Sequence, residues 1–204
     1  MRCSLNQNGH FETQEEISAK WNKDVLTYSI INYTQDFDKL RSALNLAMTT
    51  WDIEIPIKLK YVKSGGDITL EFKHKDSYFT GGVLAYAYFP GSGNASGIIV
   101  FNDNYLWSLD GKAITGEEYV RRTGKQVDNI NNFFATYNIL HTLIHEIGHS
   151  LGLTHSGFKD DVMYPFYNRV ITLTDNDILR ITSKYGKSSN NKRLKEWLKR
   201  RISR

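Results

Sequence analysis

The sequence predicts a single α/β domain in which most of the strands come before the last two helices. Segments rich in β-branched and aromatic residues dominate residues 25–101, and helical periodicity returns after residue 133. At 204 residues, with 40% hydrophobic and 24% charged residues, the chain is long enough for one core and short for two. The chain also contains no internal repeat.

Five segments are predicted to be strands, because they alternate apolar and polar residues or form short apolar runs bounded by turn residues. In order they are Val25–Asn32, Ile57–Val62, Ile68–Phe72, Val83–Phe89 and Gly97–Phe101. Three segments have helical spacing or helix caps instead, namely Phe37–Trp51, Phe133–Ser150 and Thr174–Gly186. Residues 108–132 are polar, show little periodicity and are expected to form a loop.

The positive charge of the chain is concentrated in its last 18 residues. Residues 187–204 carry eight Lys or Arg and one Glu, so their net charge is +7 and the body, residues 1–186, is left at −3 out of a total of +4. Leu194, Trp197, Leu198 and Ile202 fall on one face of a short basic helix, which suits an anionic membrane surface or another polyanion. The alternative is a solvated, frayed terminus or a helix that packs Trp197 on the body. Nucleic acid is not favoured, because the body is acidic.

The single cysteine, Cys3, excludes an internal disulfide and a zinc site built from cysteines. No apolar run is long enough to span a membrane, and MRCSLNQNGHF lacks the apolar segment of a secretory signal. The chain therefore stays inside the cell, follows a leader outside this sequence, or is exported by another route.

The stretch HEIGHSLGLTH, from His145 to His155, predicts a catalytic zinc site. His145 and His149 are four residues apart on a predicted helix, so both imidazoles project from one face and can reach one ion. Gly152 permits a sharp turn that returns His155 as a third ligand, and Glu146 follows the first ligand as a general base. Three neutral imidazoles leave one position for water, and such water attacks a carbonyl, most naturally that of a peptide. Coincidental spacing of surface histidines is a poor alternative, because half of the six histidines lie in this stretch.

Further along, DVMYP (Asp161 to Pro165) places Met163 before a tight turn, in the manner of the Met-turn that forms a hydrophobic floor under the imidazoles of metzincins. With GHF, LTYSIINYT, VLAYAY, HEIGHSLGLTHS and MYPFY, nearly the whole chain up to Gly186 resembles a matrixin, the catalytic domain of a matrix metalloproteinase. Ser156, directly after the third histidine, favours matrixins over other metzincins.

The resemblance implies a twisted five-stranded mixed sheet with three helices and a cleft that cuts proteins, often of the extracellular matrix. It implies that His145, His149 and His155 hold the zinc ion and that Glu146 is the base. It also implies a secreted, monomeric protein. The implied substrate-binding residues are Leu84 and Ala85 on the edge strand, Pro165 and Tyr167 in the outer wall of the specificity pocket, and His141 at its depth-setting position.

The chain departs from the family at its other metal sites. Matrixins hold a second, structural zinc with three histidines and an aspartate; His74 and Asp76 match two positions, whereas Tyr86 and Val100 stand at the others. Two ligands do not close a tetrahedral site, so structural zinc is predicted to be absent and His74 to be an exposed loop residue.

The calcium loop of the family is shortened to SYFTGG here, and NDNY offers one carboxylate, so calcium binding is predicted to be absent or weak. The nearby loop is then expected to be held by packing of Tyr78, Phe79 and Tyr86.

Two further departures concern regulation. About twenty extra residues between Trp107 and Phe133 form either a flap or exosite beside the cleft or a mobile loop. Arg2 and Cys3 match the family's inhibitory cysteine switch, but its remaining motif residues are replaced, so Cys3 is interpreted as a weak or vestigial switch.

The sequence thus favours a zinc endopeptidase. The alternative is a non-catalytic protein that binds peptides or polyanions on a matrixin scaffold and is targeted by its basic tail.

Overall fold

The computed structural model describes residues 2–6, 19–33, 36–189 and 196. One mixed sheet forms the base of the domain, in the order β1-β5-β6-β4-β2-β3. Its strands are β1 (Arg2–Asn6), β2 (Val25–Ile30), β3 (Lys58–Tyr61), β4 (Ile68–Lys73), β5 (Val83–Tyr88) and β6 (Ile98–Asn102). The helices are α1 (Phe37–Asp52), α2 (Gly116–Thr123), α3 (Ile139–Ser150) and α4 (Asp175–Tyr185), with a short 3₁₀ turn at Gly93–Ala95.

The five predicted strands form the mixed sheet, as the sequence led us to expect. β3, β2, β4 and β6 are parallel to one another, and β5 runs antiparallel to β6. β1 adds a sixth strand that the sequence did not indicate, antiparallel to β5. The strand is polar (RCSLN), and backbone pairing of that kind leaves little hydrophobic pattern to detect.

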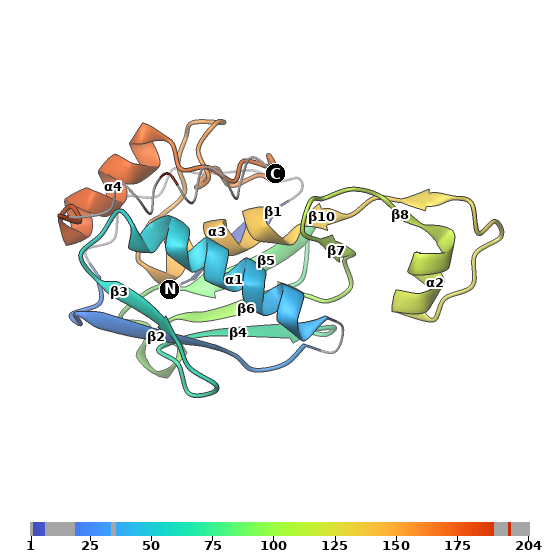
Figure 1. Cartoon of the computed structure of the whole chain (residues 1–204), viewed down its shortest axis with the longest axis horizontal. Coiled ribbons are helices and arrows are strands. Elements are labelled where there is room, and N and C mark those ends of the chain that lie inside the picture. The colour runs from blue at the N-terminus through green and yellow to red at the C-terminus, as the bar shows by residue number, and fades with distance from the viewer. Residues whose placement is uncertain (1, 7–18, 34–35, 190–195, 197–204) are drawn as a thin grey trace.

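α1 and α3 lie side by side over one face of the sheet and enclose the hydrophobic core (Figure 1). The apolar positions of α1 recur at helical spacing, and its Leu40, Leu44, Met48 and Trp51 are buried. The Trp51 indole donates a hydrogen bond of 2.9 Å to the Ile144 carbonyl of α3. This bond joins the two helices directly beneath the stretch that carries the histidines.

α3 begins at Ile139 and not at Phe133, where the sequence placed its start. The Asn138 side chain caps the helix by accepting from the backbone amides of Leu140 and His141. Phe133 lies in the two-residue strand β9 (Phe133–Phe134) and is 72% exposed, so its agreement with the helical period of α3 is fortuitous.

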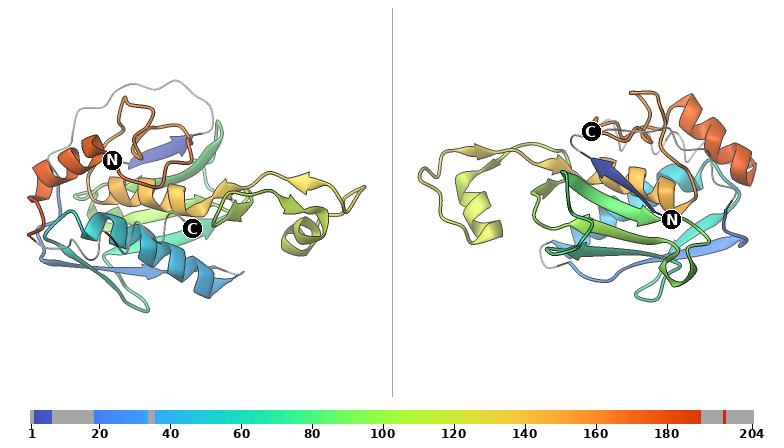
Figure 2. Two further views of the ribbon diagram at one scale, coloured as in Figure 1. Left: turned by 45° about the horizontal axis from the view of Figure 1, so that its top comes forward. Right: turned by 180° about the vertical axis from the view of Figure 1, so that it is seen from behind.

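The segment predicted to be a loop forms an arm that projects from the body (Figures 1 and 2). Its base is the parallel pair β7 (Trp107–Ser108) and β10 (Tyr137–Asn138), and its outer part pairs β8 (Ile114–Thr115) with β9. α2 lies on this outer part, capped by Thr115 and ended by Gly124 in the left-handed region (φ 68°). The prediction of a wholly irregular loop was therefore wrong.

The predicted basic helix within residues 187–204 lies outside the described residues, apart from residues 187–189 and 196. Within the described part of the chain, no helix has the length and apolar character needed to cross a membrane.

Candidate metal centre

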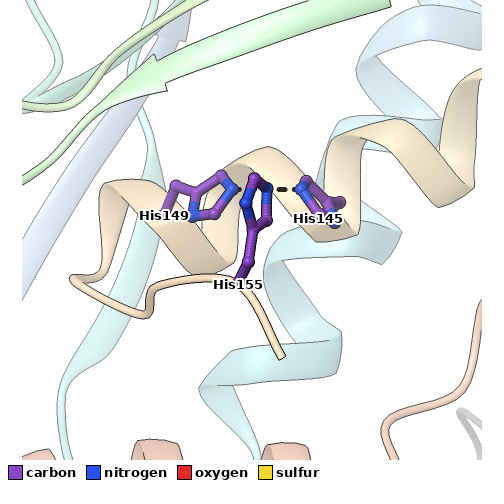
Figure 3. A group of neighbouring side chains, drawn as sticks. All are labelled: His145, His149 and His155. Carbon is purple, nitrogen blue, oxygen red and sulfur yellow. Dashed lines mark hydrogen bonds between the residues drawn. The ribbon is translucent and has the colours of Figure 1, made fainter. Parts of the chain in front are cut away.

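Three histidines meet at the end of α3 (Figure 3). His145 and His149 project from successive turns of the helix, and His155 comes back toward them from the loop that follows. One nitrogen from each ring lies within 4.8 Å of the others. Among the described residues, this is the one group of three or more potential metal-binding side chains so arranged.

The two helix histidines are oriented by backbone carbonyls. His145 Nδ1 lies 2.7 Å from the Val162 carbonyl oxygen, and His149 Nδ1 lies 2.6 Å from the Leu153 carbonyl oxygen. Since a carbonyl only accepts, each Nδ1 carries the proton and each neutral ring turns a lone pair on Nε2 toward the cluster. The two Nε2 atoms are 3.0 Å apart. Two nitrogens that share one tetrahedral zinc ion would stand about 3.3 Å apart, so the donor set fits zinc.

Burial keeps these imidazoles neutral. Removal from water lowers the pKa of His145 and of His149 well below 6.5, and the neighbouring histidines lower both values further. A neutral imidazole is the form that binds a metal, so the protein environment favours the ligand form of both side chains.

The turn that returns His155 depends on Gly152. This residue has φ +97°, a conformation that side chains other than that of glycine seldom adopt, and a Cβ there would come within 2.8 Å of the Ala19 carbonyl oxygen. After the turn, the Ser156 amide donates to the Met163 carbonyl at 2.8 Å and ties the loop to the predicted Met-turn.

Met163 is fully buried and lies against α3 directly below the histidines. A Cβ at Gly148 would collide with the Met163 sulfur and come within 3.0 Å of the Trp51 ring. The glycine between the two helix histidines therefore lets the methionine reach the helix backbone. A hydrophobic floor at Met163 beneath the imidazoles stays a prediction.

Glu146 and His141 are both fully buried on α3. His141 Nδ1 lies 2.5 Å from the Val170 carbonyl oxygen, and the ring meets Tyr167 edge-on at 5.0 Å between centroids. Burial lowers the pKa of His141 to about 4, against a smaller opposing effect of the Val170 carbonyl. The Tyr167 hydroxyl accepts from the Asn138 amide at 2.6 Å, and Pro165 is buried nearby in the chain. These contacts gather His141 and Tyr167, two of the predicted pocket residues, on the side of α3 that leads to the arm.

Leu84 and Ala85 are buried in β5, but β5 is not the outermost strand of the described sheet. β1 pairs with its outer side, with Leu5 opposite Ala85 and Cys3 opposite Ala87 (Figure 2). The edge on which the sequence placed the substrate backbone is thus occupied by the chain's own N-terminal strand.

Side-chain contacts connect the residues at which the resemblance to matrixins suggested a second zinc, around His74, Asp76 and Tyr86. His74 Nε2 lies 3.1 Å from Asp103 Oδ2 with 72% of the His74 side chain exposed, and the Tyr86 hydroxyl donates to Asp76 at 2.8 Å. Tyr86 and Val100 are direct neighbours across β5 and β6. The predicted packing around Tyr86 is confirmed: its ring meets Tyr78 at 5.5 Å and Phe79 at 5.9 Å.

Two residues of α4 that the sequence did not single out also support the centre. Asp177, fully buried, accepts from the amides of Val162 and Met163 at 2.9 and 3.4 Å. Arg180 donates to the Thr154 carbonyl in the loop that carries His155. In the sequence both look like ordinary helix residues, and only the spatial return of α4 to the loops after α3 reveals them.

Comparisons with known proteins agree with the resemblance in the sequence. The family model described as Matrixin matches residues 20–186. The chain is 35% identical over 181 residues to matrix metalloproteinase-26 of Homo sapiens, which covers 82% of this chain and 60% of that protein. It is 34% identical over 199 residues to stromelysin-1 of Equus caballus, covering 91% of this chain and 36% of that protein. It is also 33% identical over 205 residues to matrilysin of Felis catus, covering 94% and 69%.

Proposed function

Because the chain belongs to the matrixin family, we propose that it is a zinc-dependent endopeptidase that hydrolyses peptide bonds in proteins, including proteins of extracellular-matrix type. The observation that carries the proposal is the trio of His145, His149 and His155, in which both helix imidazoles are turned by backbone carbonyls so that their Nε2 atoms converge. We propose an extracellular place of action on the same family grounds.

In the proposed mechanism His145, His149 and His155 would hold one zinc ion. A zinc ion bound there would lower the pKa of a water molecule to about 7 and polarise the scissile carbonyl. Glu146, next to His145 on α3, accepts the proton of the attacking water and returns it to the leaving amide nitrogen. The buried surroundings of α3 exclude bulk water from these groups and so strengthen their electrostatic effect.

We propose that substrate binds as an extended strand beside β5, with Leu84 and Ala85 supplying backbone hydrogen bonds. Pro165 and Tyr167 form the outer wall of the pocket for the side chain after the scissile bond, and His141 limits its depth. A pocket of intermediate depth or less follows from this placement. A preference of a thousandfold or more for leucine over alanine after the scissile bond would contradict it.

The test is cleavage of a quenched fluorescent peptide and of denatured collagen by the purified chain. Cleavage should stop when a chelator is added and return with zinc, and Glu146→Ala should remove it while zinc remains bound. Cleavage that persists in Glu146→Ala would refute the proposal. A wild-type chain that holds zinc but cleaves neither substrate would favour the alternative, a non-catalytic protein that binds peptides or polyanions.

The pairing of β1 with β5 bears on the interpretation of Cys3. Substrate pairing on Leu84 and Ala85 requires residues 2–6 to leave this edge, whichever side chains they carry. We propose that backbone pairing restrains the cleft and that the Cys3 thiol contributes little. Deletion of residues 1–6 should lower KM for the peptide, whereas Cys3→Ala should leave both KM and the response to thiol reagents unchanged. Activation by Cys3→Ala alone would show a working thiol switch instead.

A further inference from the structure

His155 differs from the other two histidines in how it is placed. His145 and His149 stand on α3, so the helix backbone fixes their positions. His155 lies beyond the end of the helix on an irregular loop and is only partly buried. Its position relative to the other two therefore depends on what holds the backbone of residues 154–156.

Arg180 of α4 holds that backbone. Its Nη2 donates to the Thr154 carbonyl oxygen at 2.9 Å, to the Thr154 hydroxyl at 3.2 Å and to the His155 carbonyl oxygen at 3.5 Å. One guanidinium nitrogen is thus bonded to two successive backbone carbonyls, those of Thr154 and of the third histidine, His155. Hydrogen bonds from a charged donor are stronger than those from a neutral donor.

The helical turn of α4 that precedes Arg180 contacts the second loop near the histidines, which contains Val162 and Met163. Asp177, three residues earlier and so on a neighbouring part of the same helix face, accepts from the amides of Val162 and Met163. The Val162 carbonyl oxygen accepts the hydrogen bond from the Nδ1–H group of His145 at 2.7 Å. One face of α4 therefore sets the distance between the loop of His155 and the loop that orients His145.

We propose that Arg180 is a positioning residue for the metal centre, which fixes the third histidine by holding the backbone carbonyls of Thr154 and His155. The inference rests on the proposed zinc site, and it assigns Arg180 no contact with substrate or with the ion.

A positioning role for Arg180 can be distinguished from a purely electrostatic role, because the two roles predict opposite effects on zinc binding. Arg180 Nη2 lies 2.9 Å from the Thr154 carbonyl oxygen and 3.5 Å from the His155 carbonyl oxygen, so the positive guanidinium lies close to the third histidine. A nearby positive charge by itself weakens the binding of a cation. If charge were the whole effect of Arg180, its removal would tighten zinc binding; if it positions His155, its removal weakens zinc binding.

The experiment measures the zinc dissociation constant of the full chain by competition with a chromophoric chelator. Arg180→Gln removes both the charge and the guanidinium group, and Arg180→Lys keeps the charge but loses the guanidinium group. Leu179→Gln, at a neighbouring position of α4 that is 64% exposed, is the matched control. We expect the dissociation constant to rise about 10–100-fold in Arg180→Gln and to rise also in Arg180→Lys, with no change in Leu179→Gln.

A second readout separates positioning from a general loss of stability. The visible spectrum of the cobalt-substituted protein at saturating metal reports the geometry around the ion, and it should differ between wild type and Arg180→Gln. Wild-type affinity or tighter binding in Arg180→Gln, or a wild-type cobalt spectrum with only a lower unfolding temperature, would overturn the inference. A wild-type chain that binds zinc but cleaves no peptide would refute the proposed endopeptidase and leave the positioning role standing. A wild-type chain that binds no zinc would overturn both.

Discussion

The resemblance to matrixins assigns zinc-binding positions to two regions of this chain, and these regions differ in what surrounds their imidazoles. At the end of α3, two rings are fully buried, and their Nδ1 atoms are bonded to the carbonyls of Val162 and Leu153. In the loop after β4, the imidazole of His74 is largely exposed and lies beside Asp103.

The difference shows how a protein prepares a ligand for a metal. A buried imidazole whose Nδ1 already donates to a carbonyl is fixed in one orientation and one protonation state. Little reorganisation therefore accompanies metal binding. In the second region, Tyr86 donates to Asp76 and His74 pairs with Asp103. The polar groups that match the family's ligands there interact with other protein groups.

We expect the largest difference between the two regions, in zinc content and in peptide cleavage, when one histidine is removed from each. His149→Ala should reduce bound zinc from about one equivalent per chain to none and abolish peptide cleavage, because two imidazoles do not hold a catalytic zinc. His74→Ala should leave zinc content and cleavage unchanged. The measurement is metal content by elemental analysis of the purified, dialysed variants. A wild-type content of about two zinc ions, falling to about one in His74→Ala, would show that the second region binds metal after all.

The stability of the metal-free protein should depend on pH through its buried histidines. Burial depresses the folded-state pKa of His141 from 6.5 to about 4, so the unfolded chain takes up a proton at a higher pH than the folded chain. Stability is therefore fully present above about pH 6.5 and falls as the pH drops toward about 4, by about 3 kcal/mol for this group. Urea unfolding across this range should show the decrease.

His141→Phe keeps a ring of similar size and should make that decrease in stability smaller, while the buried His145 and His149 still contribute to it. If His141→Phe shows the full wild-type decrease, then His141 is not the group responsible.

The sequence was most informative where a short pattern determines the chemistry. The spacing of His145, His149 and His155 with Gly152 was sufficient to predict that the three rings meet, because helix periodicity and one turn fix their directions. Helical periodicity located α1, whose apolar face is buried in the core, and the capping residues Thr174 and Gly186 located α4.

The sequence was least informative where the placement depends on backbone pairing or on distant segments. β1 pairs through its backbone, and its polar residues gave no strand pattern. α2 does carry local signals: Thr115 with Glu118 three residues later at its start, and Gly124 at its end. No local signal identifies Asp177 or Arg180, because their role depends on how α4 meets the loops after α3.

Gly148→Ala tests the packing beneath the buried cluster. The added methyl group would collide with the Met163 sulfur and approach the Trp51 ring, so the floor of the centre must shift. Overpacking of this kind typically costs about 1–3 kcal/mol of stability. We expect a loss in that range from urea unfolding, together with weaker zinc binding. Gly157→Ala, where a Cβ meets nothing within 4 Å, should change neither quantity and serves as the control.

The smallest effect is expected in the second region, from Tyr86→Phe. The change removes the hydroxyl that donates to Asp76 at 2.8 Å, and a single hydrogen bond of this kind contributes about 1 kcal/mol. Asp76 still accepts from the Tyr78 amide at 3.0 Å, so its carboxylate keeps a partner. Tyr105→Phe is the control, because the Tyr105 hydroxyl makes no hydrogen bond among the described residues, whereas its ring meets Tyr137 at 5.2 Å.

A loss of about 1 kcal/mol in Tyr86→Phe and almost none in Tyr105→Phe, measured by urea unfolding, would mean that the hydroxyl contributes one ordinary hydrogen bond. The Tyr86 ring, which also meets Tyr88 at 5.8 Å, would then keep the loop in place through contacts that the substitution preserves. A loss several times larger would instead make Asp76 and Tyr86 the structural centre of this region. In that case the contact between Asp76 and Tyr86 would stabilise the second region, whereas we propose that a bound ion stabilises the end of α3. The two regions would then differ in chemistry and not in preorganisation.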